Sequence, residues 1–426
     1  MQSSIIDFYM NLSSHRLQLA KFLKWLHRNP EMFHCVENFL QRNQLPLTQI
    51  PSFIGIKSRR SYITFSGMSW FLMIRLVRNT TQYHQNHQRH FDMMLSMMFQ
   101  RHKVPKLLNP TCIAILQEHR CDVMSVASHP TAPLLATGSW DNTVKLWRLS
   151  PDGSEVTYVA NLPGQSYYDH IRSVAFHSSI PLLATGSCDY TVKLWKIGPG
   201  GSNATCIAIL KGHRCDVRSV AFHSILPLLA TGSDDYTAKV WNLSSDNSAP
   251  ICISFLRGHT NSVVSVAFHP TFPLLASGSH DKTAKLWRFS PDGSTPTCVA
   301  TLEGHRNYIN SVAFHPTAPL LATGSADHTA KLWRLSPDNL SATCVATLEG
   351  HINWVRSVAF HPTAPLLATG SSDHTAKLWY FSLAGKTATC VATLEGHSDR
   401  VNSVAFDNEG KILVTGSSDK TVRFWR

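Results

Sequence analysis

Residues 297–333 read TCVATLEGHRNYINSVAFHPTAPLLATGSADHTAKLW, and this stretch decides the fold of most of the chain. It holds four short runs rich in Val, Thr, Leu, Phe and Trp, separated by clusters of Gly, Pro, Asp and Asn. Such runs are typical of short β-strands joined by tight turns, and nothing in the stretch has helical spacing. The stretch therefore predicts one small sheet of four strands.

The same unit returns along the chain, and a tryptophan near its end marks each copy. The interval is 46 residues, except for 48 between the first two copies, and the marking residues are Trp147, Trp195, Trp241, Trp287, Trp333, Trp379 and Trp425. A sheet that is apolar on both faces cannot bury them alone, but sheets stacked radially around an axis bury one another. The repeat therefore predicts seven sheets around one axis.

The two ends of the repeat array complement each other. The first unit opens with an outer-strand sequence, Thr111 to Leu116, before any inner strand has appeared, and the last unit stops at its third strand, Thr421 to Trp425. If the early strand fills the vacant place in the last sheet, the ring closes without open edges. We expect an all-β seven-bladed propeller over residues 111–426, closed by strand 111–116 in the last blade.

The repeat also follows a known pattern. Gly-His, then about 27 residues, then Ser-x-Asp-x-Thr-x-x-Leu-Trp, resembles the WD40 repeat family over residues 111–426. The resemblance implies a propeller that binds partners, with peptides docking on the narrower face around a central channel. Repeat 1 departs from the pattern with Glu118-His119, and repeat 2 has Gly164-Gln165 plus two extra residues. The residue after Trp is never the family's Asp.

Carboxylate, imidazole and hydroxyl groups recur at fixed places, and together they could suggest a hydrolase triad. The aspartates are Asp141, Asp189, Asp235, Asp281, Asp327, Asp373 and Asp419, and the histidines are His119, His213, His259, His305, His351 and His397. A catalytic site is normally built once, whereas this set occurs six times, so we interpret it as structural. The resemblance implies a buried chain from the Trp indole through hydroxyl and imidazole to carboxylate, which satisfies groups that are costly to bury.

Two further motifs could suggest a ligand. A second histidine series, His129, His177, His223, His269, His315 and His361, follows the first strand of each unit. Its members stand on separate blades, whereas zinc ligands lie about 2.0–2.1 Å from one centre, so we interpret them as turn residues. The recurrent Thr-Gly-Ser lies within a strand and precedes no helix, unlike a phosphate-binding loop. The sequence predicts no metal, no cofactor and no catalytic residue.

Partner specificity is expected where the otherwise similar repeats differ. The variable positions flank the start of the innermost strand and the turn between the second and third strands, and alignment places Asp169 of repeat 2 among them. These positions carry Trp, Tyr, Arg and Asp, a mix typical of binding hot spots. We predict a site for a protein or peptide partner with an acidic group, formed by Trp354, Arg356, Tyr308 and Arg218, with Arg172, Trp140, Asp234, His280 and Arg400 around them. The alternative is drift at solvent-exposed positions.

The N-terminal residues 1–105 show no repeat. Apolar spacing predicts a small helical region with helices near Leu17 to Leu26, after Pro30, over Met68 to Val77 and over Tyr83 to Phe99, and residues 106–110 are expected to be a linker. Residues 1–106 hold 14 Lys and Arg against 4 Asp and Glu, so +10 of the net charge of +12 lies there. The basic run from Arg78 to Lys103 makes nucleic-acid or anionic-surface binding the alternative function, although we favour the solvated face of a small helical adaptor as the explanation of the charge.

Cysteine usage and apolar stretches predict where the protein acts. Six of the ten cysteines recur at one position of the repeat, and equivalent positions on neighbouring blades are too far apart for a disulfide, whose Cα atoms lie within about 7 Å. No signal peptide is evident, and the longest apolar stretch is about half the roughly twenty residues of a membrane span. We expect an intracellular protein, cytoplasmic or nuclear and not secreted, without a transmembrane segment. The expected function is a non-enzymatic interaction scaffold or adaptor, with its oligomeric state open.

Overall fold

A computed structural model of the chain describes residues 110–150, 155–164, 169–243, 249–289, 296–382 and 387–426. The chain divides into two units, Met1–Val104 and Pro105–Arg426, and every described residue belongs to the second. The predicted N-terminal helices, the basic run from Arg78 to Lys103 and residues 106–109 of the predicted linker lie outside the described residues.

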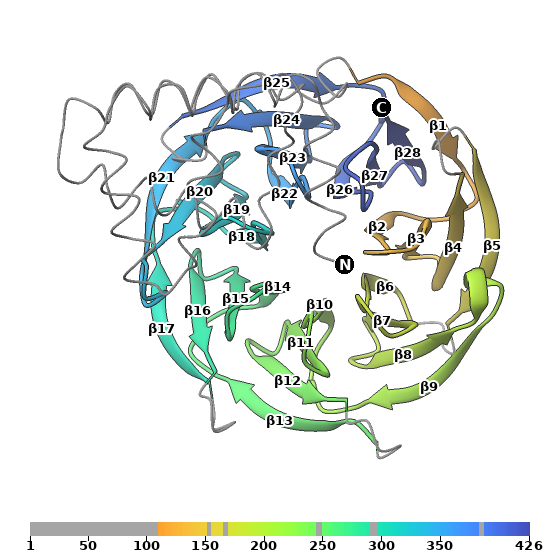
Figure 1. Cartoon of the computed structure of the whole chain (residues 1–426), viewed down its shortest axis with the longest axis horizontal. Coiled ribbons are helices and arrows are strands. Elements are labelled where there is room, and N and C mark those ends of the chain that lie inside the picture. The colour runs from red at the N-terminus through yellow and green to blue at the C-terminus, as the bar shows by residue number, and fades with distance from the viewer. Residues whose placement is uncertain (1–109, 151–154, 165–168, 244–248, 290–295, 383–386) are drawn as a thin grey trace, which may run out of the picture. The chain divides into compact units, whose positions relative to one another are not determined.

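Seven antiparallel four-stranded sheets surround a central axis (Figure 1). In each blade the strands follow one another outward, and we name them inner, second, third and outer. Blade 1 holds β2 (Val123–Ser128), β3 (Leu134–Ser139), β4 (Thr143–Leu149) and β5 (Val156–Pro163); blade 2 holds β6 (Ile171–Phe176), β7 (Leu182–Ser187), β8 (Val192–Ile197) and β9 (Ala204–Leu210). Blade 3 holds β10 (Val217–Phe222), β11 (Leu228–Ser233), β12 (Ala238–Asn242) and β13 (Ile251–Leu256).

The remaining blades repeat this order. Blade 4 holds β14 (Val263–Phe268), β15 (Leu274–Ser279), β16 (Ala284–Arg288) and β17 (Thr297–Leu302); blade 5 holds β18 (Ile309–Phe314), β19 (Leu320–Ser325), β20 (Ala330–Leu335) and β21 (Ala342–Leu348). Blade 6 holds β22 (Val355–Phe360), β23 (Leu366–Ser371), β24 (Ala376–Phe381) and β25 (Ala388–Leu394). The predicted seven-bladed all-β fold is confirmed, and the one helical element in the described part of the chain is the 3₁₀ turn η3 (Pro199–Gly201).

Blade 7 is assembled from both ends of the repeat array. It holds β26 (Val401–Phe406), β27 (Leu413–Ser417), β28 (Val422–Trp425) and, as its outer strand, β1 (Cys112–Leu116). β1 pairs antiparallel with β28, with Cys112 opposite Trp425 and Leu116 opposite Val422. The amide of Thr111 donates to the carbonyl of Arg426 over 2.9 Å, and the amide of Arg426 donates back over 3.0 Å. This pairing closes the ring.

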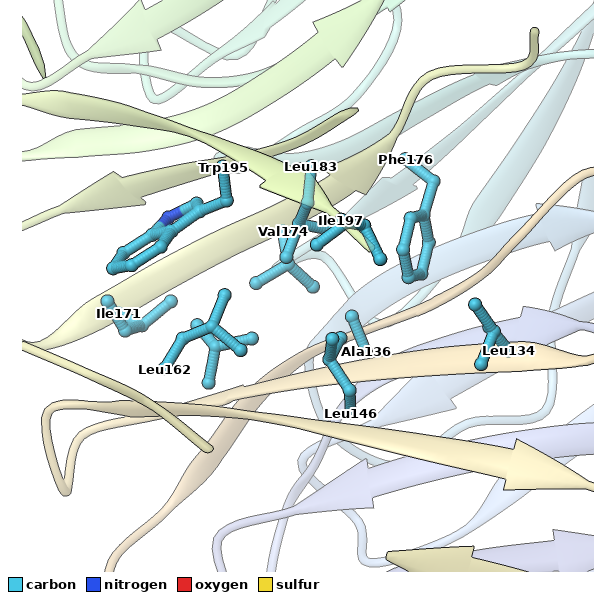
Figure 2. Close-up of a cluster of buried hydrophobic side chains, with 11 residues drawn as sticks. Leu134, Ala136, Leu146, Leu162, Ile171, Val174, Phe176, Leu183, Trp195 and Ile197 are labelled. Carbon is cyan, nitrogen blue, oxygen red and sulfur yellow. The ribbon is translucent and has the colours of Figure 1, made fainter. Parts of the chain in front are cut away.

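The hydrophobic core lies between the blades, in one cluster for each of the seven interfaces. Between blades 1 and 2, Leu146 and Leu162 of one sheet pack against Ile171, Val174 and Trp195 of the next (Figure 2). The second-strand glycines allow this close approach: a Cβ on Gly324 would lie 2.8 Å from Val355 Cγ1 of the next blade. The recurrent Thr-Gly-Ser is therefore a packing motif.

A ring of hydrogen bonds joins the inner strands. The amide of a valine in each inner strand donates to a serine hydroxyl of the neighbouring inner strand, over 3.0 or 3.1 Å in all seven cases. The bond from Val126 to Ser403 joins blade 1 to blade 7, so the hydrogen-bonded ring is also complete.

The ring has two faces, because successive turns of an antiparallel sheet lie at opposite ends of the strands. We name the face with the second-to-third strand turns and the connections into the inner strands the narrow face. The wide face carries the loops from inner to second strand and the connections from third to outer strand. Among the described residues, no helix has the length and apolar character to cross a bilayer.

The recurrent cysteines lie on the outer strands, opposite the tryptophans of the third strands, as Cys344 does opposite Trp333. Four of them are exposed, Cys112, Cys298, Cys344 and Cys390, and the nine cysteines within the described ranges carry free thiols.

Candidate interaction face

Six of the seven blades contain a buried chain of four side chains that starts at the third-strand tryptophan. In blade 5, the indole N–H of Trp333 donates to Thr323 Oγ1 over 2.9 Å. His305 Nε2 lies 2.7 Å from that oxygen, and His305 Nδ1 lies 2.8 Å from Asp327 Oδ2. Blades 1, 3, 4, 6 and 7 keep all three distances between 2.7 and 3.0 Å, through Trp147–Thr137–His119–Asp141, Trp241–Thr231–His213–Asp235, Trp287–Ser277–His259–Asp281, Trp379–Thr369–His351–Asp373 and Trp425–Thr415–His397–Asp419.

The direction of each hydrogen bond follows from the carboxylate at the end of the chain. An ionised Asp327 can only accept, so His305 carries its proton on Nδ1 and accepts the Thr323 hydroxyl proton at Nε2. This is the order of a catalytic triad, but Thr323 is 0% exposed and its oxygen already accepts the indole N–H. No substrate can reach the hydroxyl, so the chain stabilises the fold.

One carboxylate in each of these blades fixes two segments of the narrow face. Asp327 accepts from the amide of Arg306, in the connection to the inner strand, over 2.9 Å, and from the hydroxyl of Thr329, after the turn, over 2.7 Å. Burial alone would raise the pKa of Asp327, but the hydrogen bonds from His305 and Thr329 outweigh burial and hold the pKa well below its ordinary value. The pKa values of the five equivalent aspartates are lowered in the same way.

Blade 2 lacks the histidine, and a buried lysine of its third strand bonds to the turn aspartate instead. Lys193 Nζ donates to Asp169 Oδ2 over 2.6 Å and to Asp189 Oδ2 over 2.9 Å, and Trp195 donates to Thr185 over 3.1 Å. Lys193 is 3% and Asp169 0% exposed. Burial lowers the lysine pKa, but the hydrogen bonds from Lys193 to the two carboxylates outweigh it, so the pKa is raised.

The alignment that placed Asp169 at the variable position before the inner strand was wrong by one residue, because the amide of Cys188 donates to the carbonyl of His170, as that of Asp234 does to the carbonyl of Asp216. Asp169 is instead buried and accepts from Lys193 beneath the blade 2 turn. Sequence reasoning also missed Lys193. A lysine or arginine stands at this place in every repeat, so its identity carried no signal. The missing histidine and the two extra residues of repeat 2 were the only signs that another group must replace the imidazole.

The nine predicted partner-binding residues all lie at the narrow face, and every blade contributes at least one. Arg172, Arg218 and Arg356 are the second residues of their inner strands; Tyr308, Trp354 and Arg400 immediately precede inner strands; Trp140, Asp234 and His280 immediately follow second strands. Trp354 is 40% and Tyr308 38% exposed, so both aromatic rings are accessible.

The cations of blades 2 and 3 already have anionic partners. Arg172 lies 4.7 Å from the ring centroid of Trp140, donates to Cys188 Sγ and pairs with Asp216 over 3.2 Å. Arg218 pairs with Asp234 over 3.3 Å. The site predicted from the sequence did not include Cys188 and Asp216. Both occupy variable positions of the repeat, and this variability could have identified them.

Blade 6 differs, because its cation lacks such a partner. Arg356 donates through Nε to Ser372 Oγ, and its guanidinium carbon lies 5.8 Å from the ring centroid of Trp354. No carboxylate of the described residues pairs with it. Burial, with the positive charges of Arg400 and Arg218, lowers the pKa of Arg356 to about 10, so it remains charged at neutral pH. A cation without a direct ion pair to any described carboxylate therefore lies beside an exposed indole.

The other three predicted residues contribute differently. The rings of His280 and Tyr308 stack with centroids 4.6 Å apart, which joins blades 4 and 5. Arg400 is exposed, and its amide donates to Asp399 Oδ1 over 2.7 Å. Its side chain acts on the site through its charge, which disfavours the protonated form of Arg356.

Comparison with known families agrees with this geometry. The family model described as WD domain, G-beta repeat matches residues 110–148, 157–196, 204–242, 250–288, 296–334, 342–380 and 388–426. The chain belongs to the WD40 repeat family. No curated protein matches it. WD40 propellers are in general protein-interaction scaffolds, and the buried Asp–His–hydroxyl–Trp chains are part of this WD40 propeller's frame.

The second histidine series of this WD40 propeller lies at the wide face. His315 Nδ1 accepts from the amides of Thr317 and Ala318, over 3.1 and 2.8 Å, so the imidazole closes its own loop. Its ring centroid lies 4.9 Å from that of Phe360 in the next blade. The equivalent histidines of blades 1, 2, 3, 4 and 6 pack against the next blade in the same way, at 4.9 to 5.1 Å.

Proposed function

We propose that the protein is a non-enzymatic interaction scaffold whose narrow face binds a peptide or domain that carries an acidic group. The observation that carries this proposal is Arg356, a half-buried cation without a carboxylate partner, beside the exposed Trp354. A cation in this state gains most from an incoming anion, because its desolvation has already occurred on folding. Trp and Arg are also the residues that most often dominate binding energy.

The surrounding residues support the same partner chemistry. Arg172 and Arg218 are neutralised by Asp216 and Asp234, so they order the rim, whereas Arg356 is available to a ligand. The stacked rings of His280 and Tyr308 provide an apolar surface next to blade 6. A partner segment with an Asp, a Glu or a terminal carboxylate and an adjacent apolar side chain fits these groups. Action inside the cell is part of the same proposal.

Substitution of the two anchor residues tests the proposal. Acidic peptides selected from a displayed library on the full chain should bind the Trp354→Ala and Arg356→Ala variants at least about tenfold more weakly. Arg306→Ala is the matched control, since Arg306 is exposed on the same face but only its amide is engaged. Equal affinities for all variants would remove these residues from the site.

The alternative, nucleic-acid or anionic-surface binding through the basic N-terminal region, concerns residues outside the described ranges and stays a prediction. Changing Arg78, Arg89, Arg101 and Lys103 to Gln in the full chain should weaken RNA or DNA binding and flatten its dependence on salt. Unchanged binding and salt dependence would end this alternative.

A further inference from the structure

The wide face is not the same in all blades. The loop between inner and second strands reads His-Pro-Thr-Ala-Pro in blades 1, 5 and 6, at 129–133, 315–319 and 361–365. Three consecutive blades replace the alanine of this loop with a large apolar residue, which is Ile180 in blade 2, Leu226 in blade 3 and Phe272 in blade 4. Blade 3 has a second one, Ile225.

These four side chains project into solvent, and we name them the wide-face strip. Their exposed fractions are 43% for Ile180, 72% for Ile225, 47% for Leu226 and 46% for Phe272. Exposed large apolar residues are ordinary when scattered singly, but a group on adjacent elements of one face indicates an interaction site.

Hydrogen bonds connect the three loops that carry the strip. The hydroxyl of Ser178 donates to the carbonyl of Ser224 over 2.8 Å, and the hydroxyl of Ser224 donates to the carbonyl of Pro270 over 2.7 Å. Blades 1, 5 and 6 have proline at this loop position and lack the hydroxyl. Within each loop the histidine Nδ1 accepts two amides, including those of Ile180, Leu226 and Phe272. The apolar side chains are therefore presented on a preorganised surface, which lowers the entropy cost of binding.

A cavity of about 570 Å³ opens beside the strip, between blades 1 and 2. Its walls include Leu134, Phe176 and Ile197, which lie close together in the buried cluster, and Pro181, which follows Ile180 (Figure 2). Ligand-binding cavities in proteins commonly measure about 300–1,000 Å³. The cavity is thus large enough for a bulky side chain of a partner.

Charge around the cavity limits the chemistry of that partner. Lys196 is the one formally charged residue of the lining, it is exposed, and no carboxylate lines the cavity. Arg148, also exposed, donates to the carbonyl of Gly200, another lining residue. An apolar cavity with cations at its edge favours a ligand that combines apolar side chains with an acidic one.

We propose that the wide-face strip and this cavity bind a short apolar and acidic segment of a second partner protein. One bulky side chain of the segment enters the cavity, others cover Ile225, Leu226 and Phe272, and a carboxylate pairs with Lys196. The site lies on the face opposite Trp354 and Arg356 and does not depend on the narrow-face proposal. With both sites occupied, the propeller joins two partners.

The role of the wide-face strip can be tested with residues that other blades of the same chain already have. The triple substitution Ile180→Ala, Leu226→Ala and Phe272→Ala gives each loop the alanine with which blades 1, 5 and 6 fold. Short random peptides displayed on phage are selected on the full chain, and the enriched sequences are made synthetically. We expect peptides rich in Leu, Phe or Trp with Asp or Glu, and at least about tenfold weaker binding to the triple variant. The narrow-face variant Trp354→Ala is the control and should bind them unchanged.

A charge exchange tests the role of Lys196. Lys196→Glu should weaken the acidic peptides, and changing the acidic residue of the peptide to Lys should restore binding to this variant. Peptides that bind the triple variant as well as the native chain would overturn the proposal. So would strip-dependent binding to vesicles of phosphatidylcholine and phosphatidylserine without peptide binding, which would assign the strip to a membrane surface, or strip-dependent self-association in sedimentation, which would assign it to a second copy.

Discussion

Blades 2 and 5 meet the same requirement with different chemistry. In blade 5 a neutral imidazole, His305, joins the hydroxyl under the indole to Asp327, whereas in blade 2 the ammonium of Lys193 lies between Asp169 and Asp189. Two carboxylates around one ammonium have the same formal net charge, −1, as one carboxylate beside a neutral imidazole. Both blades keep the bond from the tryptophan to a threonine.

The comparison shows what the propeller frame demands at this place. It requires a buried polar group that ties the connection into the inner strand to the turn between the second and third strands, and it does not require a histidine. The two solutions differ in how they fail, since a buried ion group depends on every member, whereas a neutral chain can lose one hydrogen bond and keep the rest.

The largest effect is expected from breaking the ion group of blade 2. Lys193→Met leaves the buried Asp169 and the half-buried Asp189 without their cation, which should lower the free energy of unfolding by about 3–5 kcal/mol. Urea unfolding of the full chain measures this loss. Lys331→Met is the matched control in blade 5, where the equivalent lysine makes an exposed bond to Thr347, and its effect should stay within about 0.5 kcal/mol. Equal losses in both variants would show that blade 2 does not depend on the ion group.

A smaller loss in the free energy of unfolding is expected from breaking the hydrogen-bonded side-chain network of blade 5. Asp327→Asn keeps the shape of the side chain but removes the charge that accepts from His305, Arg306 and Thr329, at a cost of about 2 kcal/mol. Thermal unfolding of the variant measures it. Asp338→Asn, on an exposed turn of the same blade, should leave the unfolding temperature unchanged. A hydrolytic activity that disappears in Asp327→Asn while stability is preserved would contradict the structural role.

The pH dependence of stability extends the comparison of blades to the wide face. At the same loop position, blade 5 has His315 and blade 7 has Asp407. Burial lowers the pKa of His315 from 6.5 to about 4. The unfolded chain therefore binds this proton at a higher pH than the folded chain, so stability present above pH 6.5 is lost as the pH falls towards 4. The two pKa values correspond to a loss of about 2 kcal/mol at pH 5.

The variant His315→Asn should remove this part of the pH dependence. Urea unfolding at pH 7 and at pH 5 would then differ by about 2 kcal/mol less than in the native chain. His328→Asn, which changes an exposed histidine of the same blade, should keep the native difference. A native pH dependence in His315→Asn would mean that the buried imidazole is not the group that titrates.

The smallest expected change in the free energy of unfolding comes from a turn position, and it should be the same in blades 2 and 5. Tyr190 in blade 2 and His328 in blade 5 take the same left-handed turn conformation, with φ of 69° and 70°. Asn142 holds this place in blade 1 with φ of 67°, and asparagine adopts such a conformation at less cost than other residues. Tyr190→Asn and His328→Asn should each raise the free energy of unfolding by about 0.5 kcal/mol. A gain in one blade alone would show that the two turns differ after all.

The repeat predicted the fold because its period of 46 residues defines one sheet with its turns, and seven copies leave few arrangements that bury both faces. The residues at strand ends could also be placed, since inner-strand and turn positions are fixed by the same period. What the sequence could not supply is the pairing of side chains across blades. Arg172 pairs with Asp216 of the next blade and Arg356 with no carboxylate in the described ranges, although both arginines occupy the same position of the repeat.

The lysine of blade 2 and the wide-face strip were missed for different physical reasons. Lys193 has charged counterparts in every repeat, and Lys239 of blade 3 is buried as well. Only the ion pair with the buried Asp169 distinguishes Lys193 from them. Ile180, Leu226 and Phe272 are ordinary residues for a propeller core, and only their exposed fractions show that they lie outside it.

The closing strand has a consequence for synthesis of the protein. β1 is translated before every other strand of the ring, and its hydrogen-bonding partner β28 is translated after all of them. At cellular elongation rates the roughly 310 residues between them take about 15 to 60 s. During that interval an apolar strand is present without its neighbour, and such strands readily pair with other chains. Nascent chains should therefore need a chaperone on β1, and the need should end only when β28 has left the ribosome and pairs with β1.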